Sequence, residues 1–180
     1  MTKRGHFIIN GSPRVVINQL VRSPGIYYQE LIDIKKKKKY YADLIALRGT
    51  WLRLEIDKKL RVWARMKKIP KVSALVFLQA LGFTFEEIKT GIHFFEFLED
   101  SYIKENHPNT PEQALITLYE KCNPTLLKPN LQVTPLMGRN FLFRKFMNPR
   151  TYDLGSLGRR SLNKKLGLSI SENQLTLTRH

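Results

Sequence analysis

The sequence predicts an α+β fold in which antiparallel hairpins, over about residues 5–60, pack with a helical part, over about 70–168. In the first part, apolar residues alternate with polar ones, which is the period-two pattern of half-buried strands. After Pro70 the apolar spacing changes to about 3.6 residues, which is the period of a helix. A chain of 180 residues with 42% hydrophobic residues is sufficient to build a core of its own.

The first expected hairpin lies in "HFIINGSPRVVINQLV". Its strands would be the apolar runs Phe7–Ile9 and Val15–Ile17. Between them stands Asn10-Gly11, a dipeptide that tolerates the positive φ angles of a tight turn.

A second hairpin is expected in "WLRLEIDKKLRVWARM", with its turn at Asp57-Lys58-Lys59. One face is apolar and consists of Leu52, Leu54, Ile56, Leu60, Val62 and Ala64. The other face interleaves arginines with a tryptophan: Arg53, Arg61, Arg65 and Trp63. Such a face suits a nucleic-acid backbone. It is equally typical of a solvated strand face with cross-strand Arg–Glu pairs, and the pattern alone leaves both interpretations open.

The helical part carries clear boundary signals. "PKVSALVFLQALG" (70–82) reads as a helix with Pro70 near its start and Gly82 at its end. Thr84 is expected to cap a helix over "FEEIKT", and Thr110 to cap one that begins at Pro111. The stretch 137–168 predicts two helices broken around Asn148-Pro149.

The chain is strongly basic, and its charge is unevenly distributed. Its 31 Lys and Arg against 15 Asp and Glu give a net charge of +16. Residues 86–120 hold 8 acids and 2 bases, whereas 139–165 hold 8 bases and one acid. The default partner of such a chain is nucleic acid, before an anionic membrane or an acidic protein. Lys35–Lys39 are expected at an exposed loop tip, either as a solvated loop or as a general polyanion contact.

No catalytic constellation is recognisable in the sequence. It lacks a glycine-rich phosphate loop followed by Lys-Ser/Thr, an HExxH motif and an aspartate cluster suited to Mg²⁺. Cys122 is the only cysteine, which excludes an intrachain disulfide and a cysteine-based zinc site. No apolar run approaches the ~18 residues of a membrane span, so no membrane partner is expected. The residues argue for binding rather than chemistry.

The stretch "VINQLVRSPGIYY" (16–28) poses a specific question. It begins like an apolar strand and then holds a single arginine, Arg22, on a Ser-Pro-Gly bend. The arginine is either a solvated charge on a loop or a group that the bend directs at a phosphate.

Four blocks of the sequence carry a resemblance to a known family. They are "FIINGSPRVVINQLVRSPGIYY" (7–28), "RGTWLRLEID" (48–57), "LRVWARMKKIPKVSALVFLQALG" (60–82) and "YDLGSLGRRSLNKKLGL" (152–168). In this order they resemble the β subunit of multisubunit DNA-directed RNA polymerase, and in phrasing its plastid-encoded versions. The resemblance covers about 1–100 and 107–168.

The resemblance implies a fragment of a subunit several times longer, located in the plastid (chloroplast). Residues 1–28 correspond to the end of the protrusion domain and a connector, and 29–168 to the lobe domain. The remaining 169–180 are a polar tail or a truncation point. As part of a nucleotidyltransferase, the chain is expected to hold DNA in the transcription cleft, with nascent RNA nearby. The other polymerase subunits are expected as partners: the rest of β, β′, α and sigma.

The resemblance also implies site residues. Arg22 and Arg48 fall in blocks that line the DNA channel, and so do Arg159 and Arg160 of "LGRR". Ile17 and Gln19 match an edge of the pocket for rifamycin-type inhibitors. The catalytic Mg²⁺ belongs to the β′ subunit, so no cofactor, metal ligand or catalytic residue is expected in this chain. The charge alone would also suit an independent RNA-binding module of the ribosomal-protein kind.

Overall fold

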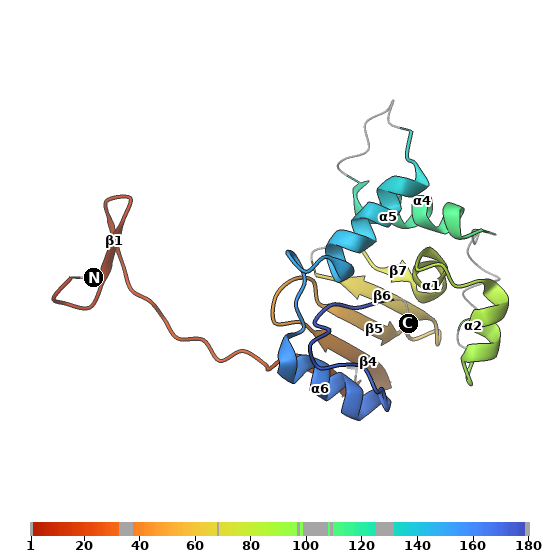
Figure 1. The fold of residues 1–180 in the computed structure, drawn as a ribbon, viewed down its shortest axis with the longest axis horizontal. Coiled ribbons are helices and arrows are strands. Elements are labelled where there is room, and N and C mark those ends of the chain that lie inside the picture. Colours follow the sequence, from red (N-terminus) through yellow and green to blue (C-terminus); the bar gives the residue numbers. More distant parts are fainter. Residues whose placement is uncertain are drawn as a thin grey trace.

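The computed structural model describes residues 2–32, 38–67, 69–96, 98, 108, 110–124 and 132–178. Two antiparallel sheets and a set of helices confirm the α+β prediction. A small hairpin near the N-terminus stands apart from the rest of the chain, to which an extended segment connects it (Figure 1). Everything that carries a core lies on the other side of this segment.

The N-terminal hairpin is shorter than predicted and has a different second strand. Strand β1 (Phe7–Ile9) pairs with β2 (Ser12–Arg14), so that Ile9 stands opposite Ser12. Asn10 and Gly11 have φ angles of 50° and 76°, and this two-residue turn returns the chain at once. The prediction of a strand at Val15–Ile17 was therefore wrong, because the tight turn fixes the register three residues earlier.

Residues 15–23 form no strand either, although their apolar composition suggested one. Val16, Ile17, Leu20 and Val21 are all exposed. A strand forms only where a neighbour supplies ladder hydrogen bonds, and in the described part of the chain none pairs with this segment.

The main sheet has five antiparallel strands that follow one another in chain order. They are β3 (Gly25–Ile32), β4 (Lys38–Ile45), β5 (Leu52–Ile56), β6 (Val62–Met66) and β7 (Val72–Ser73). Lys38 and Lys39 were expected at a loop tip but instead begin β4. There, Nζ of Lys38 forms an ion pair with Oε1 of Glu30 at 3.0 Å. The prediction for Lys35–Lys37 lies outside the described residues.

The hairpin of β5 and β6 is confirmed. Leu54 stands opposite Ala64, and Arg53 opposite Arg65, so that apolar and basic side chains lie on opposite faces. Leu60 does not join the apolar face as predicted. It sits in the turn with a φ of 59° and is 58% exposed, because the turn takes one residue more than the sequence pattern indicated.

Asp57 organises this turn. Its carboxylate accepts hydrogen bonds from the backbone N–H of Lys59 (2.7 Å) and of Arg61 (3.1 Å). It also accepts from the indole N–H of Trp63 (3.1 Å) and from Nη2 of Arg61 (3.0 Å). Burial alone would raise the pKa of Asp57, but these donors outweigh it and lower the pKa to about 2.

The stability of the chain should therefore fall in acid through Asp57. A carboxyl with a lowered pKa stabilises the folded state fully above its ordinary value of 3.8, and this contribution disappears as the pH falls toward 2. We expect about 1–2 kcal/mol, because the group is partly exposed. Urea unfolding of the chain and of D57N at pH 7 and pH 2 measures the effect. If D57N loses as much free energy of unfolding between pH 7 and pH 2 as the unsubstituted chain does, Asp57 is not the source of the acid sensitivity.

The helices follow the strands, and most lie where the sequence predicted them. They are α1 (Ala74–Ala80), α2 (Phe85–Gly91), α4 (Pro111–Cys122), α5 (Pro135–Leu142), the π-helical η2 (Phe143–Met147) and α6 (Gly155–Leu166). Thr84 caps α2 in a capping box with Glu87, and Thr110 caps α4, as expected. The helix predicted from about Pro70 begins only at Ala74, because Val72 first pairs with Ala64 as part of β7.

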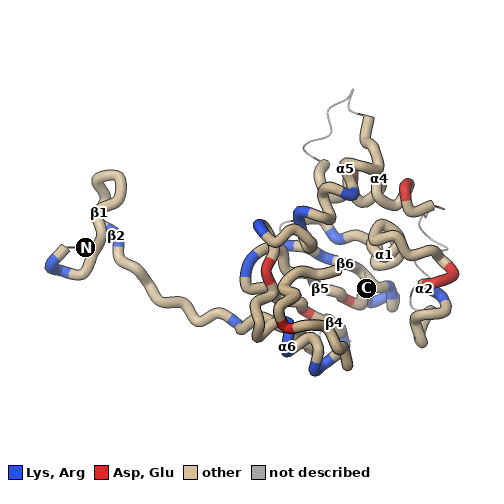
Figure 2. Tube along the Cα trace, in the orientation of Figure 1, with Lys and Arg blue, Asp and Glu red and all other residues tan. Residues whose placement is uncertain are grey.

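The core lies between the sheet and the helices. Ala64, Met66 and Val72 of the sheet meet side chains of α1, α4 and α5 there. Of the described acids of 86–120, Glu86 and Glu87 lie at the start of α2, and Glu112 and Glu120 lie on α4 (Figure 2). Cys122 is buried, which raises the pKa of its thiol to about 11 and leaves it protonated.

Candidate nucleic-acid interface

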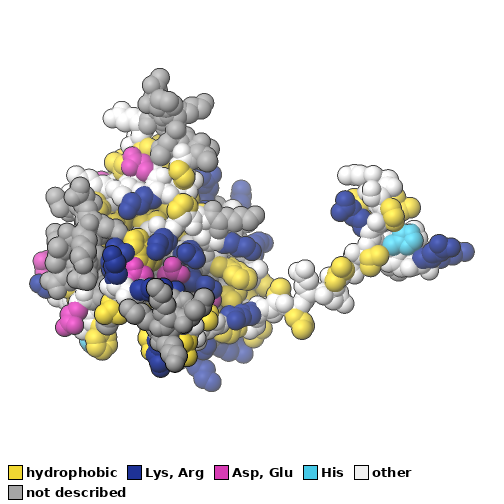
Figure 3. Space-filling model, turned by 180° about the vertical axis from the view of Figure 1, so that it is seen from behind, with side chains coloured by type: hydrophobic (Ala, Val, Ile, Leu, Met, Phe, Trp, Pro, Cys, Tyr) yellow, Lys and Arg dark blue, Asp and Glu magenta, His cyan; other side chains and the backbone are white. Residues whose placement is uncertain are grey.

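The face of the sheet opposite the core carries the arginines that the sequence singled out. We call it the basic face and define it by the side chains that alternate onto it from β4, β5 and β6: Tyr41, Asp43, Arg53, Glu55, Trp63 and Arg65. Lys and Arg side chains gather around a few acidic ones when the molecule is seen from behind (Figure 3).

Arg53 is held rigidly at the centre of the basic face. Its Nε and Nη2 donate to the two carboxylate oxygens of Asp43 at 2.6 and 2.9 Å. Its guanidinium also lies over the ring of Tyr41, 4.3 Å from the centroid. The hydrogen bonds with Asp43 raise the pKa of Arg53, so this cation keeps its charge.

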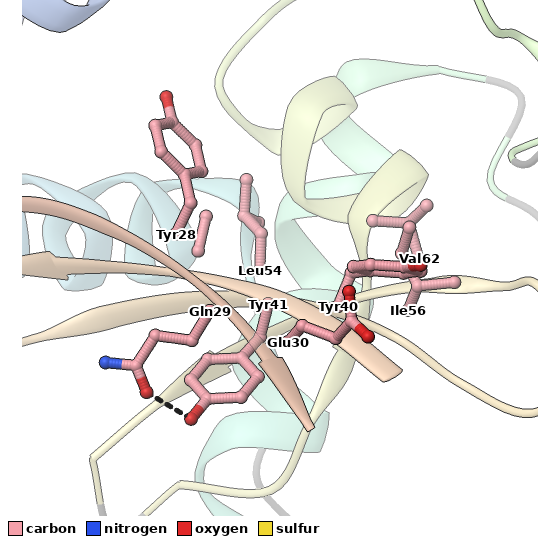
Figure 4. A pocket seen from close by; sticks show the side chains of 9 residues that line it. Tyr28, Gln29, Glu30, Tyr40, Tyr41, Leu54, Ile56 and Val62 are labelled. Carbon is pink, nitrogen blue, oxygen red and sulfur yellow. Dashed lines mark hydrogen bonds between the residues drawn. The ribbon is translucent and has the colours of Figure 1, made fainter. Parts of the chain in front are cut away.

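Arg22 reaches the same carboxylate from the bend before β3. Its Nη1 is 3.9 Å from Oδ2 of Asp43, and its guanidinium stands 5.7 Å from the ring of Tyr27. Gln29 bonds the hydroxyl of Tyr41 (Figure 4). With the Gln29 carboxamide turned over, its nitrogen donates to the Tyr41 hydroxyl and its oxygen accepts from Nη2 of Arg22 at 2.9 Å. About half of the Arg22 side chain, 53%, stays exposed.

The other two arginines of the predicted strand face have acidic partners. Arg65 lies 3.5 Å from Glu55 across the strands and remains half exposed, so the predicted alternative of a cross-strand pair is present. Arg61 is bound to Asp57 in the turn and stacks on Trp63, 5.2 Å from the centroid. Arg61 is thus the least accessible of the three.

A hollow of about 520 Å³ opens beside Arg53 and Arg65. The residues that line it are Asp43, Trp51, Arg53, Arg65, Met66, Lys67, Ile69, Pro70 and Lys71. Lys67 stands 5.2 Å from the ring of Trp51, and Lys71 4.4 Å from that of Trp63. Four cations and two indole rings thus surround or border one depression.

Sequence reasoning did not include Trp51, Lys67 and Lys71 in this surface. Trp51 precedes Arg53 by two residues and Lys67 follows Arg65 by two, so extending the strand alternation one step at each end would have found both. Lys71 follows the turn at Pro70, and no strand or helix periodicity there predicts where its side chain points.

Arg48, Arg159 and Arg160 are not among the residues of the basic face, and each has partners of its own. Arg48 donates from Nη2 to the carbonyl oxygen of Pro149 at 3.0 Å and remains largely exposed. Arg160 makes a paired contact with Glu172, at 3.0 and 2.9 Å, on an exposed side of α6.

Arg159 is only 2% exposed and donates to the carbonyl oxygens of Gln174 (2.6 Å) and Thr176 (2.5 Å). Burial lowers the pKa of this arginine, and its donors are directed at the C-terminal segment 169–178 rather than at solvent. Ile17 and Gln19 are exposed in the extended segment that follows the first hairpin.

The surface offers binding groups. Across the described stretches of the chain, no three His, Cys, Asp or Glu side chains gather as metal ligands would. No helix within the part that the structure describes is long and apolar enough to cross a membrane. Exposed guanidinium and ammonium groups beside aromatic rings can neutralise phosphates and stack on bases.

Comparison with known proteins decides the family. The family model of RNA polymerase Rpb2, domain 2, matches residues 22–180. The chain belongs to this family. The match begins at Arg22 and includes all of the main sheet and all of the helices.

The curated relatives are RNA polymerase β subunits. The chain is 47% identical over 179 residues to "DNA-directed RNA polymerase subunit beta" of Chlorokybus atmophyticus, with 99% of this chain and 16% of the relative covered. It is 40% identical over 246 residues to the protein of that name from Oltmannsiellopsis viridis, covering 99% of this chain and 17% of the relative.

A third relative, the "DNA-directed RNA polymerase subunit beta N-terminal section" of Pleurastrum terricola, is 39% identical over 213 residues, covering 99% of this chain and 19% of the relative. The chain thus spans less than a fifth of the length of these relatives.

Proposed function

We propose that this chain serves as the lobe and adjoining protrusion segment of a DNA-directed RNA polymerase β subunit, and that its basic face holds DNA in the transcription cleft. The observation that carries the proposal is the basic face. Arg53 and Arg65 lie on this face, and three further cations border it: Arg22 near Asp43, and Lys67 and Lys71 at the hollow. Against the two carboxylates of Asp43 and Glu55, these five cations give the surface an excess of positive charge. A polymerase must move over any sequence, so it requires backbone contacts without base readout.

The proposal extends to the assembly. The partners are DNA, the remainder of the β subunit, and the β′, α and sigma subunits, with nascent RNA nearby. The catalytic Mg²⁺ belongs to β′, and this chain contributes positioning and electrostatic grip to the nucleotidyltransferase. Algal and cyanobacterial relatives support a plastid location.

Arg22, which borders the basic face, tests that surface, and Arg48, which lies outside it, tests the wider DNA channel that the family implies. In polymerase reconstituted with R22A or R48A, we expect elongation complexes with shorter lifetimes than those of the wild type, and the difference should be largest at low salt. Each lost phosphate contact should lower the slope of log affinity against log salt by about 0.9. A lifetime and a salt slope identical to those of the wild type would remove these arginines from the DNA contacts.

An independent RNA-binding module would give a different result. The isolated chain would then bind structured RNA with the same affinity whether or not Arg22 is replaced, and the reconstituted polymerase would not respond. The family match over 22–180 favours the polymerase.

A further inference from the structure

We propose that helix α6 is the positioning element for Arg22: Gly158 and Ser161 fix the Ser-Pro-Gly bend that directs this arginine onto the basic face. This inference rests on the proposed function of Arg22. It assigns a role to residues about 140 positions away in the chain that are not themselves part of the basic face. Helix α6 and β3 are in extensive contact, and the helix passes the point where the bend enters the strand (Figure 1).

Two glycines, one on the helix and one in the bend, allow α6 and the bend to approach each other closely. A Cβ atom on Gly158 would come within 2.9 Å of Cβ of Pro24. A Cβ atom on Gly25 would come within 2.6 Å of Oγ of Ser161. Gly25 also has a φ of 150°, a conformation that other residues rarely adopt. The backbone of the bend is therefore fixed against α6 at two successive residues.

Tyr27 links the position of the bend to the position of Arg22. The hydroxyl of Tyr27 donates to the carbonyl oxygen of Ser23 at 2.9 Å and lies 2.8 Å from its side-chain hydroxyl. Two cations lie near the ring of Tyr27. The guanidinium of Arg22 is 5.7 Å from the ring centroid, and the ammonium group of Lys165 of α6 is 4.9 Å from it. Lys165 also donates to the carbonyl oxygen of Ile26.

Helix α6 is itself held firmly. Arg159, the neighbour of Gly158, is the buried arginine that binds two carbonyls of the segment 169–178, and Leu162 lies in the core. The helix therefore has little freedom to yield when the contact with the bend changes. A displacement forced at Gly158 should move the bend, and with it Arg22.

The variant Gly158→Ala tests the inference. Alanine favours a helix by about 1 kcal/mol over glycine, so the substitution should not weaken α6 itself. It forces Pro24 away, because the new methyl group cannot share its position. The matched control is Gly91→Ala in α2, where nothing lies within 4 Å of the added methyl group. Reconstituted polymerase is compared as wild type, G158A, G91A, R22A and the double variant G158A/R22A.

We expect G158A to shorten elongation-complex lifetime in the same direction as R22A, with a fall in salt slope of up to about 0.9, and G91A to match the wild type. In the R22A background G158A should add nothing, because it acts through Arg22. If R22A shortens the lifetime and G158A does not, the inference is overturned and the proposed function stands. The same holds if the effects of G158A and R22A on the lifetime add in the double variant. Normal R22A lifetimes would overturn both.

A second variant covers the case that G158A fails to assemble. Ser161→Ala removes the hydroxyl beside Gly25 and adds no atom, so it loosens the contact without a clash. It should shorten the lifetime by less than R22A does, and not at all in the R22A background. Lifetimes equal to the wild type would overturn the inference.

Discussion

Replacing Arg65, Lys67 and Lys71 together by glutamine is expected to weaken the grip on DNA more than any single substitution in this chain. The three cations line one hollow with Trp51 and remain outside the tight Arg53–Asp43 pair. If each meets a phosphate, the salt slope of elongation-complex lifetime should fall by about 2–3, at roughly 0.9 per contact. At physiological salt this corresponds to an affinity for DNA that is lower by about a hundredfold or more.

The control removes the same charge elsewhere. Lys89 of α2, Lys121 of α4 and Arg139 of α5 belong to the helical part of the molecule. Their replacement by glutamine should leave the slope nearly unchanged, since screening over about 8 Å weakens distant charges at physiological salt. Equal effects of the two triple variants would mean that net charge, and not the basic face, sets the grip.

The second large effect concerns stability. Arg159→Ala leaves the carbonyl oxygens of Gln174 and Thr176 without their donor and opens a cavity beneath the segment 169–178. Hydrogen bonds to charged groups contribute about 1.5–3 kcal/mol each, so the free energy of unfolding should fall by about 3–5 kcal/mol. Urea unfolding of the 180-residue chain measures it.

The neighbouring arginine is the natural control. Arg160 makes two hydrogen bonds as well, but to an exposed carboxylate, that of Glu172. R160A should lower the free energy of unfolding far less than R159A does, because exposed ion pairs stabilise little. If R160A cost as much as R159A, burial would not be the source of the effect.

The adjacent pair Arg159-Arg160 also shows what the sequence could not predict, namely which of two neighbouring arginines is buried. The motif "LGRR" presents two equivalent arginines, and only the packing of α6 against the following segment separates a buried one from an exposed one. Helical periodicity predicts that neighbours point about 100° apart. It does not say which of them meets a segment that has no periodicity of its own.

Local patterns predicted local structure well. The hairpin of β5 and β6 and the caps at Thr84 and Thr110 follow from strand alternation and cap chemistry. The predictions that were wrong depended on register or on distant partners. Val72 joins the sheet because Ala64 stands beside it, and the apolar residues after Arg14 form no strand because none pairs with them within the described chain.

The candidate site was only partly predictable for the same reason. Arg53 and Arg65 were found from alternation, and Arg22 from its unusual bend. That Arg22 and Arg53 meet at Asp43, with Arg65 beside Glu55 on the same face, depends on the pairing of the strands and on the path of the chain into β3. Asp43 carries no signal in the sequence, although it orders the guanidinium groups on this face.

Whether DNA lies against the basic face can be measured by site-specific photo-crosslinking in an assembled elongation complex. A photoreactive phenylalanine analogue is placed at Trp51, in the hollow, or at Tyr28, an exposed residue on the opposite face of the sheet. We expect crosslinks to DNA from position 51 and none above background from position 28. Crosslinks from position 28 alone, or equally from both, would contradict this expectation.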